Sequence, residues 1–150
     1  MPADNPIFAE NAAERAHLKR LTTRLSDADL LHPMPAGWTV GAVLVHLAFW
    51  DKRALVLIQK WQKEGVGPSL MDTDVVNEVT RTICLAVPPR AAVELALSCA
   101  SAIDQAIEQL SPSMIADIET NGKTVRLNRA THRGEHLREI EQALGILPKA

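Results

Sequence analysis

The sequence has little of what builds sheets, disulfide frameworks or membrane spans. It has three Trp, two Phe and no Tyr, while alanine and leucine are abundant among its 47% of hydrophobic residues. Alanine and leucine favour helices, whereas strands are enriched in aromatic and β-branched residues. The two cysteines, Cys84 and Cys99, are too few for a disulfide framework and suit a reducing compartment. We therefore expect a mostly helical protein of the cytoplasm.

An excess of one charge is lacking as well. The chain has 16 Lys and Arg against 18 Asp and Glu, a formal net charge of −2. Without a basic excess we expect neither nucleic acid nor an acidic membrane surface as a partner. The apolar runs are shorter than the roughly 18–20 residues that cross a bilayer, and the first residues do not resemble a signal peptide. The 150 residues contain no repeat or boundary, so we expect one domain spanning residues 1–150.

The spacing of apolar residues predicts four main helices. We place them at residues 7–25, 40–62, 90–110 and 129–144. Thr39 and Asn128 are the expected N-caps of the second and fourth helices. The connection between the second and third helices, residues 64–89, is long. It includes a run of spaced valines that predicts a short helix, so we expect it to cross over one end of a bundle.

Two short segments have the composition of turns. Residues 31–37 contain two prolines and a glycine, which exclude regular structure there. Asn121 and Gly122 lie between β-compatible residues within 118–125, which predicts a tight hairpin before the last helix. The expected fold class is all-α: an antiparallel four-helix bundle with a long crossover between helices 2 and 3 and a short hairpin before helix 4.

Three histidines lie on the core-facing lines of the second and fourth predicted helices. His132 and His136 are four residues apart, so their side chains share one helix face, with Cβ atoms about 5–6 Å apart. His46 lies on the inward stripe of the second helix. In an up-down-up-down bundle these two helices run in the same direction, which places the three residues at similar depths below their caps. An imidazole buried there without a partner would cost roughly 1–3 kcal/mol.

Three neutral imidazoles at one level are suitable ligands for a divalent ion. Zinc or nickel would bind them at about 2.0–2.1 Å and keep at least one coordination position open. We predict His46, His132 and His136 as this metal site; the alternative is that other core groups satisfy them or that they are exposed. Residues 132–136 also match the inverted zincin pattern H-x-x-E-H, with Glu135 as general base. We reject that reading because the carboxylates that follow lie too close on the same helix to complete the site.

Other polar residues are candidates for contacts with a substrate. Arg126, Arg129 and Arg133 form a stripe at i, i+3 and i+7 close to the histidine face. Arg129 or Arg133 would be able to clamp a carboxylate of an anionic ligand, and the alternative is a solvated charged face. Asn11 in the first helix and Asn77 in the crossover are candidates of the same kind.

Two stretches of the chain resemble the signatures of the DinB-like (YfiT-like) superfamily. The first is Gly-Trp-Thr-Val at 37–40 with His-Leu-Ala-Phe-Trp-Asp at 46–51, and the second is His132-x-x-x-His136 with the apolar residues after it. The resemblance covers about residues 9–144. It implies a four-helix bundle in which His46, His132 and His136 bind a divalent metal. The chain is also similar to the N-terminal metal-binding domain of mycothiol-dependent maleylpyruvate isomerases.

The resemblance implies an S-transferase that uses a low-molecular-weight thiol such as mycothiol or bacillithiol. A dication held by three neutral ligands keeps its full charge and lowers the pKa of a thiol or water bound to it. The expected partners are a small-molecule thiol and an electrophile, and the resemblance also implies a homodimer. Two other functions stay open. One is a hydrolase that activates water at the same site, and the other is a binding or stress-response protein whose metal is structural or vestigial.

Overall fold

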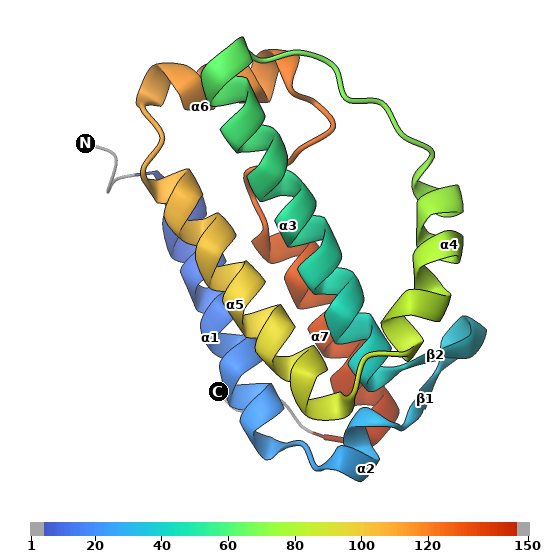
Figure 1. Ribbon diagram of the computed structural model, residues 1–150. Helices are drawn as coiled ribbons and strands as arrows, with labels where there is room; N and C mark the ends of the chain where they lie inside the picture. The colour runs from blue at the N-terminus through green and yellow to red at the C-terminus, as the bar shows by residue number, and fades with distance from the viewer. Residues whose placement is uncertain (1–4, 147–150) are drawn as a thin grey trace.

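The computed structural model describes residues 5–146, which form a bundle of four long helices with shorter elements at its ends and along one side (Figure 1). The long helices are α1 (Pro6–Arg24), α3 (Val40–Glu64), α5 (Pro89–Glu108) and α7 (Ala130–Leu144). The all-α class and the four main helices are therefore as predicted. None of the described helices combines the length and the apolarity that crossing a membrane requires.

Short elements connect the long helices. They are α2 (Asp27–Leu30), β1 (Pro33–Met34), a 3-10 turn (Pro35–Gly37), β2 (Trp38–Thr39), α4 (Thr73–Leu85) and α6 (Pro112–Asn121). Helix α4 is the short helix predicted within the crossover. The strands β1 and β2 pair antiparallel in a segment that we predicted to be irregular. That prediction was wrong because Ala36 and Gly37 both adopt positive φ, at 60° and 81°, and reverse the chain between the two prolines and β2.

The hairpin predicted around residues 121–122 is absent, and this segment ends helix α6 instead. Ser111 begins that helix by accepting a hydrogen bond from the backbone of the third helical residue. Ile118 is fully buried. Gly122 then caps the helix, and a Cβ there would lie 2.9 Å from the ring of Trp61. The Asn-Gly pair therefore closes a helix against an aromatic ring.

The helices also run in directions that differ from the expected arrangement. Helix α4 returns the chain to the end of the bundle where α3 begins, so α5 is parallel to α3, while α1 and α7 run the opposite way (Figure 1). The contacts between α3 and α7 agree. His46 faces His132, and Asp51, which comes after His46 in the chain, faces Arg129, which comes before His132, so the two helices are antiparallel. The expectation that α3 and α7 run in the same direction was wrong. The three histidines nevertheless lie at one level of the bundle.

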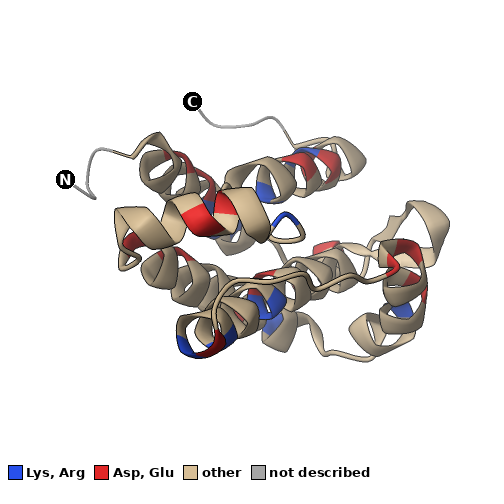
Figure 2. Ribbon diagram, turned by 90° about the horizontal axis from the view of Figure 1, so that it is seen from above, with Lys and Arg blue, Asp and Glu red and all other residues tan. Residues whose placement is uncertain are grey.

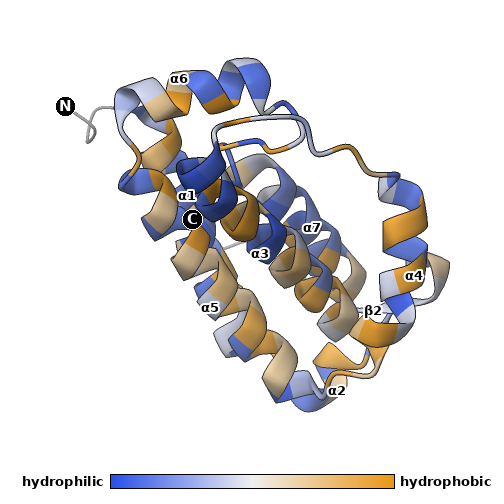
Figure 3. Cartoon of the chain, turned by 45° about the horizontal axis from the view of Figure 1, so that its top comes forward, coloured by the Kyte–Doolittle hydropathy of each residue, from blue (hydrophilic) through white to orange (hydrophobic). Residues whose placement is uncertain are grey.

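The apolar core consists of two large clusters separated by a polar layer. On α3, Leu47 belongs to one cluster and Ala54 to the other, with the buried Asp51 between them. On α5, Asp104 lies in the same way between Ala100 and Ile107. Apolar residues also gather at the end of the bundle near α2 and β2 (Figure 3). Seen from above, the acidic and basic residues are distributed along several helices (Figure 2).

Helix α4 packs on the bundle through a small apolar cluster around Cys84 and through polar contacts. Of its residues only Cys84 is buried. The indole Nε1 of Trp50 donates to Oδ1 of Asn77 at 3.0 Å, which links α3 to the middle of α4. Arg53 of α3 donates to the backbone oxygen of Ser69 at 3.0 Å, in the segment that leads into α4. The space between α3, α4 and α7 therefore has a polar wall on the α4 side.

Candidate metal centre

The structure brings together the three predicted histidines. Nε2 of His46, from α3, lies 3.2 Å from Nε2 of His132, from α7. The three ring centroids, including that of His136, are 4.8 to 5.2 Å apart. One ligand atom of each residue lies within 4.8 Å of the others. The triad is thus positioned to hold one metal ion.

Helix caps fix the positions of these side chains. The hydroxyl of Thr39 accepts a hydrogen bond from the backbone of Ala42 at 3.1 Å and starts α3, as predicted. The start of α7 is held from another helix, because Oδ1 of Asn11 accepts from the backbone N–H of Arg129 at 2.8 Å and of the next residue at 3.0 Å. The predicted cap Asn128 lies one residue before the observed N-cap, although its Oδ1 still accepts from the backbone N–H of residue 131 at 3.2 Å.

The surroundings keep two of the three imidazoles neutral. Burial lowers the pKa of His46 to about 4, and the charge of His136 acts in the same direction. Burial also lowers the pKa of His132 to about 3, with further lowering by the other two histidines and by the nearby Arg129 and Arg133. Neutral imidazole is the form that binds a metal, so both residues are ready to ligate at neutral pH.

The donor atoms also fit a metal ion. Bonds of about 2.0–2.1 Å in a tetrahedral site separate two ligand nitrogens by about 3.3–3.4 Å, close to the 3.2 Å between the Nε2 atoms of His46 and His132. Nδ1 of His46 and Nδ1 of His136 are buried and have no hydrogen-bond partner among the described residues. Oε2 of Glu139 is 3.4 Å from the latter atom, outside hydrogen-bonding alignment. Buried nitrogens without partners are unusual, so the chain alone does not satisfy this cluster.

The triad lies in the wall of a cavity of about 600 Å³. The ring of Trp38 stands edge-on to His46 at 5.5 Å between centroids, and the ring of Trp50 stands edge-on to it at 6.5 Å. The cavity is formed by the β1–β2 hairpin, α3, α4, α7 and the loop before α7. Its other lining residues are Met34, Pro35, Val43, Thr73, Asn77, Thr124, Arg126, Asn128, Arg129, Thr131, Glu135 and Glu139.

The four predicted substrate contacts divide into two groups. Asn77 and Arg129 line the cavity beside the triad. Arg133 and Asn11 do not line it, because both are buried in the polar layer, at 1% and 2% exposure. Arg133 points at carboxylates, and Asn11 donates to the backbone oxygen of Leu127 at 2.9 Å while capping α7. The expected stripe of three arginines on one helix is not present, since α7 begins after Arg129.

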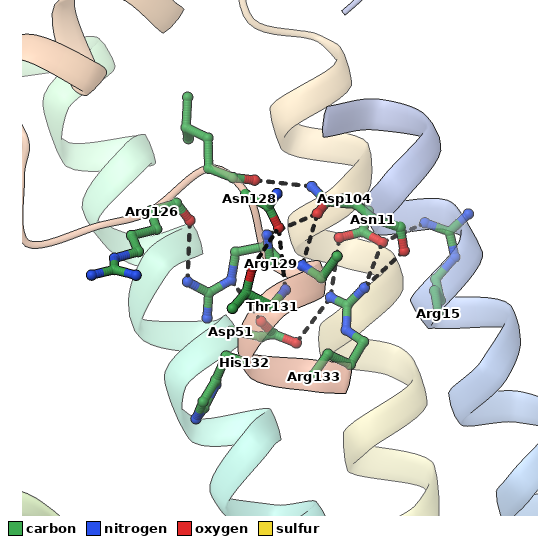
Figure 4. A network of polar contacts seen from close by, with 12 residues as sticks. Asn11, Arg15, Asp51, Asp104, Arg126, Asn128, Arg129, Thr131, His132 and Arg133 are labelled. Carbon is green, nitrogen blue, oxygen red and sulfur yellow. Dashed lines mark hydrogen bonds and ion pairs between the residues drawn. The ribbon is translucent and has the colours of Figure 1, made fainter. Parts of the chain in front are cut away.

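The polar layer is a network of arginines and aspartates that the sequence did not reveal (Figure 4). Arg133 binds both oxygens of Asp104, at 3.0 and 3.1 Å, and one oxygen of Asp51 at 3.3 Å. Arg129 donates from Nε to the other oxygen of Asp51 at 2.9 Å. Arg15 of α1 reaches Asp104 at 2.7 Å. The network ties all four long helices together one turn from the metal ligands.

Two features of the sequence nevertheless point to this network. Asp51 and Asp104 lie on lines of otherwise apolar residues in their helices, and a carboxylate in such a place is rarely buried without a cationic partner. Arg129 and Arg133 flank His132 in the chain, four residues apart. Two buried acids and two arginines on inward faces predict a charged layer once the helices are known to meet at one level.

One comparison with known protein families gave a match. The model of the DinB superfamily matches residues 10–140, which include all three histidines and both aspartates. No curated protein and no solved structure gave a match.

Proposed function

The chain belongs to the DinB superfamily, and on that basis we propose that it binds a divalent ion, zinc or nickel, and transfers a low-molecular-weight thiol to an electrophile. The observation that supports this proposal most is the triad of His46, His132 and His136. Its nitrogens converge beside a cavity, and two buried Nδ1 atoms have no partner in the described chain. The family resemblance suggests a thiol of the mycothiol or bacillithiol kind.

The residues present suit this chemistry. A divalent ion supplies positive charge that lowers the pKa of a bound thiol and so favours the thiolate nucleophile. Three neutral imidazoles hold such an ion without cancelling its charge. The rings of Trp38 and Trp50 flank His46 edge-on. A cavity of about 600 Å³ lies in the range of small-molecule sites, so a thiol and a small electrophile can be held together.

A hydrolase is the second candidate, and one observation favours it. Glu135 and Glu139 line the cavity on the same helix as His136. A carboxylate beside the metal site is able to take a proton from water, and the same metal ion would lower the pKa of that water. The two candidates differ in one requirement, because the hydrolase needs no added thiol.

The test is an assay of the zinc-loaded and nickel-loaded protein with a chromogenic electrophile, such as 1-chloro-2,4-dinitrobenzene, and with a chromogenic ester. Each reaction is run with and without a small thiol, beside a His132→Ala/His136→Ala variant. S-transfer predicts turnover of the electrophile that needs both the thiol and the histidines. Ester turnover without thiol would favour the hydrolase. No turnover of either kind by metal-loaded protein would leave a binding protein with a structural metal.

A further inference from the structure

We propose that the cavity takes an anionic ligand and that Arg126 and Arg129 bind its carboxylate beside the histidine triad. That the ligand is a thiol rests on the proposed function. The inference adds that this thiol carries a carboxylate. It rests on the charges around the cavity and on the hydrogen-bond donors that these two arginines leave free.

The polar layer next to the cavity has more positive than negative charge. Three guanidinium groups, those of Arg15, Arg129 and Arg133, share the carboxylates of Asp51 and Asp104. Both carboxylates are almost fully buried, at 5% and 1% exposure, and so are Arg129 and Arg133, whereas the side chain of Arg15 is 33% exposed. One positive charge of the layer is therefore not compensated within it.

Further positive charge lies along the same side of the cavity. Arg53 lies over the ring of Trp50, 5.6 Å from its centroid, and donates to the backbone oxygen of Thr124 at 3.0 Å. Burial lowers the pKa of Arg53, and the charge of Arg129 acts in the same direction. The loop that carries Thr124 also carries Arg126, which lines the cavity and is exposed. An anion entering the cavity would meet this positive field.

Arg126 is the residue best placed to contact such an anion. Its guanidinium makes no hydrogen bond or ion pair within residues 5–146. Its backbone oxygen accepts from Nη1 of Arg129 at 3.2 Å, so the two residues lie against each other. In Figure 4 the side chain of Arg126 points away from the two aspartates, to the side of the network where the ring of His132 also lies.

Arg129 keeps one donor for the same ligand. Its Nε is used by Asp51 and its Nη1 by the backbone oxygen of Arg126, while Nη2 has no partner among the residues that the structure describes. Guanidinium groups bind carboxylates with parallel hydrogen bonds, and charge-assisted bonds of this kind are about twice as strong as neutral ones. The acidic residues of the cavity, Glu135 and Glu139, lie on α7 and repel an anion. A bound carboxylate would thus be directed to the arginine side.

The experiment compares two thiols that differ only in charge, 3-mercaptopropionate and 3-mercaptopropionamide, on cobalt-substituted protein. A thiolate that binds cobalt gives a charge-transfer absorption band, so affinity is read without turnover. The variants are Arg126→Gln and, as a control with the same change of charge outside the cavity, Arg20→Gln on the exposed side of α1. The parent is expected to bind the acid about 10-fold more tightly than the amide.

Arg126→Gln is expected to lose most of that preference while its affinity for the amide stays the same, and Arg20→Gln is expected to keep the preference. Equal affinity of the parent for the two thiols would overturn the proposal. So would an equal loss for both thiols in Arg126→Gln, or the same loss of preference in Arg20→Gln.

A second probe separates this proposal from the thiol chemistry. Glutarate and glutaramide contain no thiol, and their binding to the protein without added metal is followed by changes in NMR chemical shift. If neither thiol gives a band but glutarate binds more tightly than glutaramide in a way that depends on Arg126, the anion site stands and S-transfer fails. If neither thiol gives a band and glutarate and glutaramide also bind with equal affinity, both the anion site and S-transfer fail.

Discussion

Helices α3 and α7 carry two polar clusters about one turn apart, and these differ in how their polar atoms are satisfied. In the arginine–aspartate network every charged group has an oppositely charged partner, and within residues 5–146 Nε of Arg133 is the single buried side-chain atom of the network left without a hydrogen bond. In the histidine triad, two of the three residues have a buried nitrogen without a hydrogen-bond partner in the described part of the chain. A cluster that the chain satisfies by itself stabilises the fold. The triad instead brings one ligand nitrogen of each histidine to within 4.8 Å of the others, the arrangement that a metal ion from outside the chain requires.

The largest expected effect comes from breaking the satisfied cluster. Arg133→Ala removes the donors that bind both oxygens of Asp104 and one oxygen of Asp51, so these buried carboxylates lose hydrogen-bond partners. Breaking a buried pair of this kind costs about 3–5 kcal/mol. Urea unfolding of the metal-free protein measures the loss. Arg138→Ala is the matched control, because its side chain is 61% exposed and it should change stability by less than about 0.5 kcal/mol. A loss below about 1 kcal/mol in Arg133→Ala would show that the network is not structural.

The unsatisfied cluster should make the metal-free protein sensitive to acid. In the folded state the pKa of His46 is lowered from 6.5 to about 4 and that of His132 from 6.5 to about 3. At pH values between the folded and the unfolded pKa, the unfolded chain therefore binds more protons than the folded chain. Stability should then fall as the pH drops from about 6.5 towards 4, by at most about 1.4 kcal/mol per pH unit for each histidine.

The measurement is urea unfolding at a series of pH values, with His46→Gln/His132→Gln as the comparison. This variant should show a clearly flatter pH dependence between pH 4 and 6.5. The same slope in parent and variant would assign the acid sensitivity to other groups and would contradict the environment described for the triad.

Metal should stabilise the protein through the triad alone. A ligand at 100 times its dissociation constant stabilises the folded state by about 2.7 kcal/mol, so zinc should raise the melting temperature of the parent. His132→Ala should be nearly as stable as the parent without metal and should gain little from zinc, while Arg138→Ala should gain as much as the parent. An equal gain in His132→Ala would place the bound metal elsewhere.

The smallest expected effect concerns the start of α7, which positions two of the ligands. Asn11 is buried and caps this helix with two backbone hydrogen bonds, whereas the bond from Asn128 is exposed. Asn11→Ala should cost about 2 kcal/mol in thermal unfolding, and Asn128→Ala about 0.5 kcal/mol. Equal costs for the two variants would mean that the cap from α1 does not set the position of α7.

Much of the fold and the triad could be predicted from local patterns. Helical spacing located the long helices, and the inward lines of the second and fourth helices identified His46, His132 and His136. The hairpin prediction failed because an Asn-Gly pair looks the same at a helix end and in a hairpin turn. Only the packing of Gly122 against Trp61 distinguishes the two.

The direction of the helices and the charged layer depend on tertiary structure. Nothing in the local sequence of α4 says that it carries the chain back along the bundle, so the parallel pair of α3 and α5 was missed. Asp51 and Asp104 become partners of Arg133 only where α3, α5 and α7 meet at one level. Because the three helices pack together at this level, Arg133, which we predicted to contact substrate, points into the core.

The most direct test of the difference between the two clusters is the metal content of tag-free protein, measured by elemental analysis beside His132→Ala/His136→Ala and Arg138→Ala. The account predicts about one equivalent of zinc or nickel in the parent and in Arg138→Ala, and none in the double histidine variant. No metal in the parent after reconstitution, or the same content in the double variant, would contradict it.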